Sequence, residues 1–215
     1  KPGSMGMPAA GWDVQLLDER GRPVTDGEVG EICVNLASGK PVGLFEKYHK
    51  NDKQTAFSYR DGYYHTGDVA YRDADGYFWF VGRNDDLIKS SGYRISPFEV
   101  ESVLLEHPAV REVAVTGTPD AVRGMAVKAT IVLNKYFHGT DALVRQLQEH
   151  VKQRTAPYKY PRVIEFVDTL PMTISGKIKR ALIRRLDSAK STIEGAKTTV
   201  IDTTKNVISK AKGAK

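Results

Sequence analysis

The segment from Gly82 to Ile95 divides the chain into two kinds of sequence pattern. Before it, short apolar and aromatic runs are bounded by glycine and other turn-forming residues, as in antiparallel β-structure. After it, β-branched runs alternate with runs of helical period, which is typical of a mixed layer of strands and helices. The predicted fold class is therefore α+β: a small antiparallel β-subdomain followed by a compact mixed α/β domain.

The local patterns predict individual elements on both sides of this segment. Strands are expected near residues 12–17, 30–35 and 76–82, and then at 93–95, 110–116, 127–133 and 163–167. Ser96-Pro97-Phe98-Glu99 is a capping box with proline at the first helical position, so a helix is expected over residues 97–106. Further helices are expected at 141–154 and 176–186, with residues 118–124 as a loop.

The charge of the chain is concentrated near its C-terminal end. The net charge is +6 over 215 residues, yet residues 177–215 hold eleven lysines and arginines against three acidic residues. A basic tail of this kind can contact nucleic acid or an anionic membrane, but it is more often solvated. No zinc-ligand spacing and no interleaving of aromatic with basic residues supports nucleic-acid binding, so none is expected. Membrane contact through residues 190–215 is the less favoured alternative.

A single cysteine, Cys33, excludes an internal disulfide and suits a reducing compartment. No apolar run approaches the length that spans a bilayer. A cytoplasmic location is expected, with the mitochondrial matrix as the alternative. Because the first residue is Lys1 rather than methionine, we expect the chain to be a piece of a longer protein.

Three charged side chains are candidates for chemistry, and each has a plainer interpretation. Asp68 follows a Thr-Gly pair and can accept two hydroxyl hydrogen bonds, as from a ribose diol, or can simply close an Asx turn. Arg83 offers a planar fork for a phosphate, a carboxylate or sugar hydroxyls, or is one charge on a surface hairpin. Lys177 can follow charge developing on a phosphate, or is a surface lysine; its neighbour Arg180 is expected on the solvated face.

Several segments in order carry a family resemblance: His65–Asp68, Gly82–Arg94, Ala156–Arg162 and Leu170–Lys177. Together they resemble consecutive motifs of the adenylate-forming superfamily. The detail of APYKYPR and LPMTISGKIKR is most similar to medium-chain acyl-CoA synthetases. The resemblance covers roughly residues 1–186 and has no counterpart for the tail.

The resemblance implies an activity in two steps. A carboxylic acid and Mg-ATP give an acyl-adenylate and pyrophosphate, and CoA then displaces AMP to give a thioester. In the family a small C-terminal domain rotates between the two steps. The implied roles are nucleotide binding for Asp68 and Arg83, a hinge at Asp85, adenylation catalysis by Lys177, CoA binding by Ser91, Gly92, Tyr93, Arg123 and Lys159, and a substrate or phosphate contact by Arg94.

The resemblance also implies what this chain lacks. The phosphate loop and the motif that binds adenine and magnesium are expected in a missing N-terminal part, so ATP/AMP, CoA and Mg²⁺ are expected ligands but no metal ligand is assigned here. The expected domains are residues 1–84 as the end of the large domain, 85–187 as the mobile domain and 188–215 as a basic tail. The chain is expected to be inactive without the missing part. The alternative is a non-catalytic fragment that binds a nucleotide, CoA or a partner.

Overall fold

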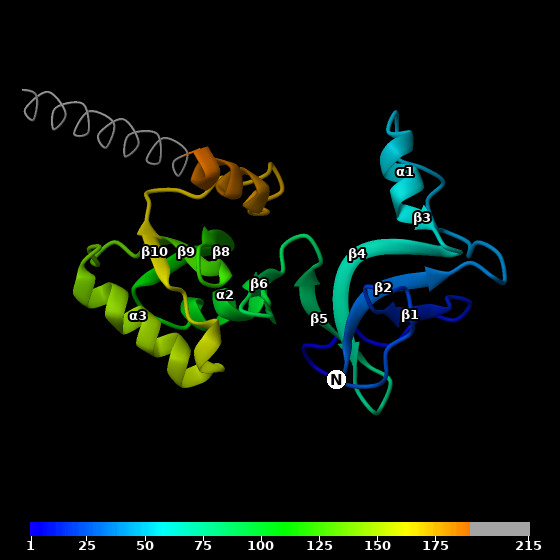
Figure 1. Ribbon diagram of the computed structural model, residues 1–215, viewed down its shortest axis with the longest axis horizontal. Helices are drawn as coiled ribbons and strands as arrows, with labels where there is room; N and C mark the ends of the chain where they lie inside the picture. The colour runs from blue at the N-terminus through cyan, green and yellow to red at the C-terminus, as the bar shows by residue number, and fades with distance from the viewer. Residues whose placement is uncertain (190–215) are drawn as a thin grey trace, which may run out of the picture. The chain divides into compact units, whose positions relative to one another are not determined.

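The computed structural model describes residues 1–189, so all but the first two residues of the tail expected at 188–215 lie outside the described residues. The chain forms two compact units (Figure 1). The first holds Lys1–Leu87 and Arg94–Glu99, and the second holds Ile88–Tyr93 and the described residues from Val100 onward. In the described part of the chain, no helix is long and apolar enough to cross a membrane.

The first unit is an antiparallel sheet with the order β1-β2-β4-β3, and β5 pairs with β4. Its core joins Leu16, Ile32, Ala70 and Phe78 from four strands, because alternate residues of each strand face inward. The predicted antiparallel β-unit is confirmed. Its strands are β1 (Val14–Leu17), β2 (Val29–Asn35), β3 (Tyr59–Arg60), β4 (Tyr63–Arg72) and β5 (Phe78–Arg83).

The sequence analysis missed one helix of this unit, α1 (Asp52–Ser58). The side chain of Asn51 caps it by accepting the Gln54 N–H at 3.1 Å. Ser58 is its buried residue, whereas Phe57 is exposed. This helix buries little apolar surface. Its sequence therefore lacks the periodic apolar stripe by which an amphipathic helix is predicted.

The second sheet has the order β10-β9-β6-β7, and β8 pairs with β9. The β10–β9 pair is parallel, whereas β6 and β8 pair with β9 in antiparallel fashion. The strands are β6 (Ile88–Ser90), β7 (Tyr93–Ile95), β8 (Val110–Asp120), β9 (Gly124–Leu133) and β10 (Val163–Phe166). The helices are α2 (Pro97–Leu105), α3 (Asp141–Arg154), the 3-10 turn Pro157–Lys159 and a helix over residues 180–189.

The two helices with the clearest sequence signals are confirmed. Ser96 Oγ accepts the Glu99 N–H at 3.3 Å and starts α2, as the capping box predicts. In α3, Leu143, Leu147 and Val151 are buried at the predicted spacing. The α+β fold class is confirmed.

Two predicted boundaries are wrong. Residues 118–124 are not a loop, because β8 and β9 continue through them as a hairpin paired down to Asp120 and Gly124. The last helix begins at residue 180 rather than 176. Backbone hydrogen bonds from Thr173 to Lys177 and from Lys179 to Pro171 hold residues 171–179 in a tight non-helical loop first.

A buried lysine ties the last helix to the second sheet. Lys128 on β9 is 5% exposed, and its Nζ lies 2.6 Å from a carboxylate oxygen of Glu165 on β10. It also pairs with Asp187 of helix 180–189, whose side chain is 9% exposed. The two carboxylates compensate a cation that would otherwise be costly to bury.

We expect Lys128→Ala to lower the free energy of unfolding by about 3–5 kcal/mol, because it leaves the mostly buried carboxylate of Asp187 without the Lys128 cation. Lys152→Ala is the matched control, because the Lys152–Glu149 pair at 3.6 Å is exposed and should contribute less than about 1 kcal/mol. Urea denaturation measures both. Equal small losses would contradict a structural role for the Lys128 cluster.

Candidate functional site

Residues 66–68 form a bulge inside β4. In the register of β2 with β4, Ile32 alone stands opposite these three residues. Thr66 Oγ1 donates to the Ile32 carbonyl at 2.8 Å and accepts the Asp68 N–H at 3.0 Å. Gly67 has φ +78°, a backbone conformation that glycine adopts without strain. The expected turn is thus a kink within a continuous strand, and such bulges redirect side chains.

The bulge places Asp68 beside Arg83. The two residues are register partners, Asp68 inside β4 and Arg83 at the end of β5, and Arg83 Nη1 lies 3.4 Å from Asp68 Oδ1. A Cβ on Gly67 would lie 3.0 Å from Arg83 Nη2, so the absence of a side chain on Gly67 leaves room for the guanidinium. Both side chains remain partly exposed, at 37% for Asp68 and 49% for Arg83. They can therefore reach a ligand.

The surroundings shift the pKa of both groups. Burial raises the pKa of Asp68 above its ordinary value, although the charge of Arg83 works in the opposite direction. Burial disfavours the charged form of Arg83 as well, but Asp85 and Asp68 outweigh it and raise its pKa. The pair thus places a positively charged guanidinium beside a partly desolvated carboxylate.

Asp85 lies in the turn that follows β5. Its Oδ1 is 3.2 Å from Arg83 Nε, and the N–H groups of Asp86 and Leu87 both donate to the Arg83 carbonyl at 3.1 Å. The Asn84 N–H donates to the Gly67 carbonyl at 2.8 Å. The predicted Asx-rich turn is confirmed, and Arg83 bonds to both the bulge and the turn.

Three residues expected to bind CoA meet at the tips of two hairpins. Ser91 and Gly92 form the β6–β7 turn with φ of +49° and +83°. The Ser91 N–H donates to the carbonyl of Arg123, in the β8–β9 turn, at 3.0 Å. Asp120 holds this second turn by accepting the Arg123 N–H at 2.8 Å. A Cβ on Gly92 would meet open space, so this backbone is accessible.

The other two expected CoA residues, Tyr93 and Lys159, are brought together by a residue that the sequence analysis missed. The Tyr93 ring stacks on Tyr158 with centroids 4.0 Å apart and an interplanar angle of 16°. Lys159 Nζ lies 5.8 Å from the centre of the Tyr158 ring. Tyr158 lies in the APYKYPR motif, directly before Lys159. An aromatic residue next to a candidate lysine is the sequence signal that could have identified it.

Arg94 is paired rather than free. Its guanidinium forms an ion pair with Glu19, in the turn after β1, and the two side chains are 41% and 57% exposed. The ordinary strength of an exposed ion pair is low enough for a ligand to displace it.

Lys177 lies just after the turn at residues 174–176, in the loop formed by residues 171–179. Its N–H donates to Thr173 Oγ1 at 3.0 Å, and its carbonyl accepts the Thr173 N–H at 2.8 Å. Gly176 has φ +77°, which the tight loop requires. The Lys177 side chain is exposed. The backbone is thus held firmly while the ammonium group extends into solvent.

Arg180 does not lie on the solvated face, as the sequence analysis expected. Its Nε and Nη2 donate to the two oxygens of Glu101 on α2, at 3.1 and 2.6 Å. Glu101 also accepts the Val115 N–H at 2.8 Å and is 6% exposed. A bidentate pair of this kind is directional, so it anchors the chain three residues after Lys177.

Glu31, Cys33 and His65 bring three ligand-type atoms within 4.8 Å of one another. Two features argue against a cation there. Burial, and then the charge of Glu31, raise the pKa of the Cys33 thiol to about 12, so the sulfur is neutral at ordinary pH. The Arg60 guanidinium already lies 3.7 Å from Glu31 Oε2. No metal role is assigned to these residues.

The comparisons with known proteins agree with the family resemblance. Residues 99–177 match the AMP-binding enzyme C-terminal domain. The described residues have the fold of the C-terminal domain of adenylate-forming enzymes. A solved structure of such an enzyme aligns with this chain. The chain therefore corresponds to the C-terminal portion of acyl-CoA synthetases of the adenylate-forming superfamily, which confirms the resemblance.

Two relatives and one structure illustrate the match. The chain is 54% identical to acyl-coenzyme A synthetase ACSM3, mitochondrial, from Rattus norvegicus, over 86% of this chain and 32% of that protein. It is 53% identical to 4-hydroxybutyrate–CoA ligase 1 from Metallosphaera sedula, over 88% of this chain and 34% of that protein. The anthranilate CoA ligase AuaEII, solved with anthranoyl-AMP, aligns with TM-score 0.77 and 39% identity over 89% of this chain and 36% of its own. The chain thus spans about a third of the length of these relatives.

We expect Asp68→Asn to raise the free energy of unfolding at neutral pH. The raised pKa of Asp68 means that its charged form is disfavoured in the folded state, and the amide removes that charge. The wild-type carboxyl becomes neutral as the pH falls through its raised pKa, so the difference between the two proteins should shrink there. Urea denaturation over an acidic pH series measures this. A less stable variant at neutral pH would show that the Arg83 pair outweighs burial.

Proposed function

We propose that this chain is the C-terminal part of an ATP-dependent acid–CoA ligase that forms AMP, and that it carries groups for both half-reactions. The pairing of Asp68 with Arg83 at a bulge is the observation that carries the proposal. Their register across β4 and β5 and their separation of 3.4 Å leave a carboxylate and a guanidinium both accessible to one ligand. A ribose diol and an adjoining phosphate match those two groups.

In the first half-reaction a substrate carboxylate oxygen attacks the α-phosphorus of ATP. The new acyl–phosphate bond forms as the bond to pyrophosphate breaks. Lys177 is the proposed catalytic residue, because its ammonium group can neutralise charge developing at the reacting oxygens. The clamp between Arg180 and Glu101, with Nη2 to Oε2 at 2.6 Å, supports this role by fixing the backbone nearby.

Magnesium would accompany ATP, and we assign its ligands to a preceding domain. Mg²⁺ is held by one or two free carboxylates and by substrate phosphates. Asp68, the carboxylate proposed to contact the nucleotide, already pairs with Arg83. The ion would supply charge neutralisation at the phosphates.

In the second half-reaction the CoA sulfur attacks the acyl carbon, and AMP leaves with the bonding electrons. The surface formed by Ser91, Gly92, Tyr93, Arg123 and Lys159 is the proposed CoA site. Gly92 lets the backbone approach the pantetheine, and the cations suit the phosphates of CoA. The stacked Tyr93 and Tyr158 rings give that surface a flat apolar wall. Arg94 would contact substrate or phosphate after leaving Glu19.

Asp85 is the proposed hinge, about which residues 85–187 would move as one domain relative to residues 1–84. This movement would exchange the face that carries Lys177 for the face that carries the proposed CoA site. The cytoplasm is the proposed location, with the mitochondrial matrix as the alternative; the rat relative is named as a mitochondrial protein, which supports that alternative. The proposed partners are the missing N-terminal domain, CoA and a carboxylic acid. The acid pocket belongs to that missing domain, so its specificity is not assigned.

The test is ATP–pyrophosphate exchange with acetate, butyrate, octanoate and benzoate as acids. We expect no exchange from the 215-residue chain, because the proposed phosphate and metal ligands lie elsewhere. Adding the N-terminal domain of the same synthetase should restore exchange. Exchange by this chain alone would contradict its proposed incompleteness. Binding of AMP or CoA without exchange in the reconstituted protein would favour the non-catalytic alternative.

Variants of the complete synthetase should separate the two half-reactions. We expect Lys177→Ala to lower adenylation by about 10²-fold or more and to spare thioester formation from supplied acyl-adenylate. Lys179→Ala is the matched control, and Tyr93→Ala should show the opposite pattern, with a raised KM for CoA. Rapid-quench assays of each half-reaction measure these effects. Equal losses in both steps for Lys177→Ala would contradict its role.

A further inference from the structure

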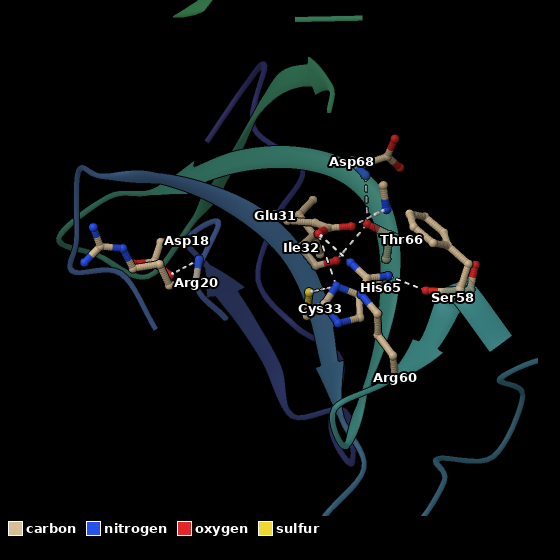
Figure 2. A network of polar contacts seen from close by, with 12 residues as sticks. Asp18, Arg20, Glu31, Ile32, Cys33, Ser58, Arg60, His65, Thr66 and Asp68 are labelled. Carbon is tan, nitrogen blue, oxygen red and sulfur yellow. Dashed lines mark hydrogen bonds and ion pairs between the residues drawn. The ribbon is translucent and has the colours of Figure 1, made fainter. Parts of the chain in front are cut away.

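A mostly buried carboxylate lies directly behind the bulge that carries Asp68. Figure 2 shows the Glu31 side chain between β2 and β4, between His65 and the segment from Thr66 to Asp68. Glu31 Oε1 accepts the Gly67 N–H at 3.0 Å, and its Oε2 lies 3.1 Å from His65 Nδ1. The Glu31 side chain is 15% exposed. The carboxylate thus joins the backbone of the bulge to a buried ring.

The bulge requires such a partner. Three residues of β4 stand opposite one of β2, so the regular ladder cannot supply partners for every backbone group there. The Gly67 carbonyl accepts the Asn84 N–H at 2.8 Å, and Thr66 Oγ1 accepts the Asp68 N–H at 3.0 Å. The Gly67 N–H instead reaches across to Glu31. The carboxylate therefore stands in for a missing strand-to-strand hydrogen bond.

The Glu31 carboxylate is itself held in place. His65 is 8% exposed and is the register partner of Cys33, so its ring is fixed by the sheet. Arg60 Nη2 lies 3.7 Å from Glu31 Oε2 and supplies positive charge on the same side. A charged acceptor gives a shorter and stronger hydrogen bond than a neutral one. The Gly67 peptide is thus bonded to a group with little freedom to move.

We propose that Glu31 is a positioning residue for nucleotide binding, which acts through the Gly67 peptide on Asp68 and Arg83. This inference rests on the proposed function. Figure 2 shows the Asp68 carboxylate pointing away from the Glu31 network, so Glu31 acts without being a ligand itself. The Gly67 carbonyl accepts the N–H of Asn84, the residue next to Arg83, at 2.8 Å, so movement of this peptide acts on Arg83 as well.

The geometry predicts an effect limited to the nucleotide. Asp68 and Arg83 both depend on the position of the Gly67 peptide, whereas the proposed CoA surface belongs to the second unit. Loss of the Glu31 hydrogen bond should therefore raise the KM for ATP and leave the KM values for the acid and CoA unchanged. A purely structural role would instead lower the melting temperature without a selective effect on ATP.

Two conservative variants separate the hydrogen bond from the charge. Glu31→Gln keeps an oxygen that can accept the Gly67 N–H, whereas Glu31→Asp keeps the charge but withdraws the carboxylate by one methylene. In the complete synthetase, we expect Glu31→Asp to raise the KM for ATP by about 10- to 100-fold, as displacement of a positioning group does. Glu31→Gln should stay close to the wild type. Glu46→Gln, at an 88% exposed position of the same unit, is the control.

Asp68→Ala is the reference variant that distinguishes the proposed nucleotide site from the proposed role of Glu31. A raised KM for ATP in Asp68→Ala but not in Glu31→Asp, measured below the melting temperature of both, would overturn the role of Glu31 alone. An unchanged KM in both variants would overturn the proposed nucleotide site and, with it, this inference. A raised KM for ATP, acid and CoA together in Glu31→Asp would also overturn it.

The same inference can be checked on the 215-residue chain without any activity. We expect the amide resonances of Gly67 and Asp68 to move in ¹H–¹⁵N spectra of Glu31→Asp, and to stay in place in Glu46→Gln. Amide hydrogen exchange at Gly67 should become faster in the first variant. Unchanged resonances and exchange at Gly67 would mean that Glu31 does not hold the bulge.

Discussion

The site depends on one guanidinium that contacts carboxylates from two different segments of the chain. Arg83 ends β5, pairs with Asp68 across the sheet at 3.4 Å, and contacts Asp85 of the following turn at 3.2 Å. It fits because Gly67 has no Cβ. Arginine suits this place because its planar fork can engage two partners at once, which a lysine ammonium group does less well. The nucleotide proposal and the hinge proposal therefore share one residue.

The bulge and its supporting network illustrate how a regular sheet can hold an irregular site. Isolated departures from the strand ladder cost free energy, and they persist where the surroundings compensate them. Glu31, Thr66 and Asn84 each satisfy one backbone group of the bulge. The core of Leu16, Ile32, Ala70 and Phe78 lies in the same sheet and keeps the strands in register. The regular packing of the core thus holds in place the strands whose residues satisfy the backbone of the bulge.

Sequence patterns predicted the elements whose signals are local. The apolar stripe of α3 and the cap at Ser96 are periodic or short-range features, and both are confirmed. The Glu101–Arg180 clamp joins residues 79 positions apart, so no spacing rule finds it. The Glu31–Gly67 contact depends on a strand register that appears only when β2 and β4 pair. The sequence could therefore single out Asp68 and Arg83 as candidate site residues, but not the groups that support them in the structure.

The contacts around Ser96 bear on how a hinge at Asp85 would work. Ser96 Oγ donates to the Val81 carbonyl, and Arg94 pairs with Glu19, so residues 94–99 are held to the first unit. Rotation about Asp85 would carry these residues along and would have to break both contacts. Each involves one hydrogen bond or one exposed ion pair, which contributes about 1 kcal/mol or less. Contacts this weak can hold residues 94–99 to the first unit without preventing the rotation that the proposed hinge needs.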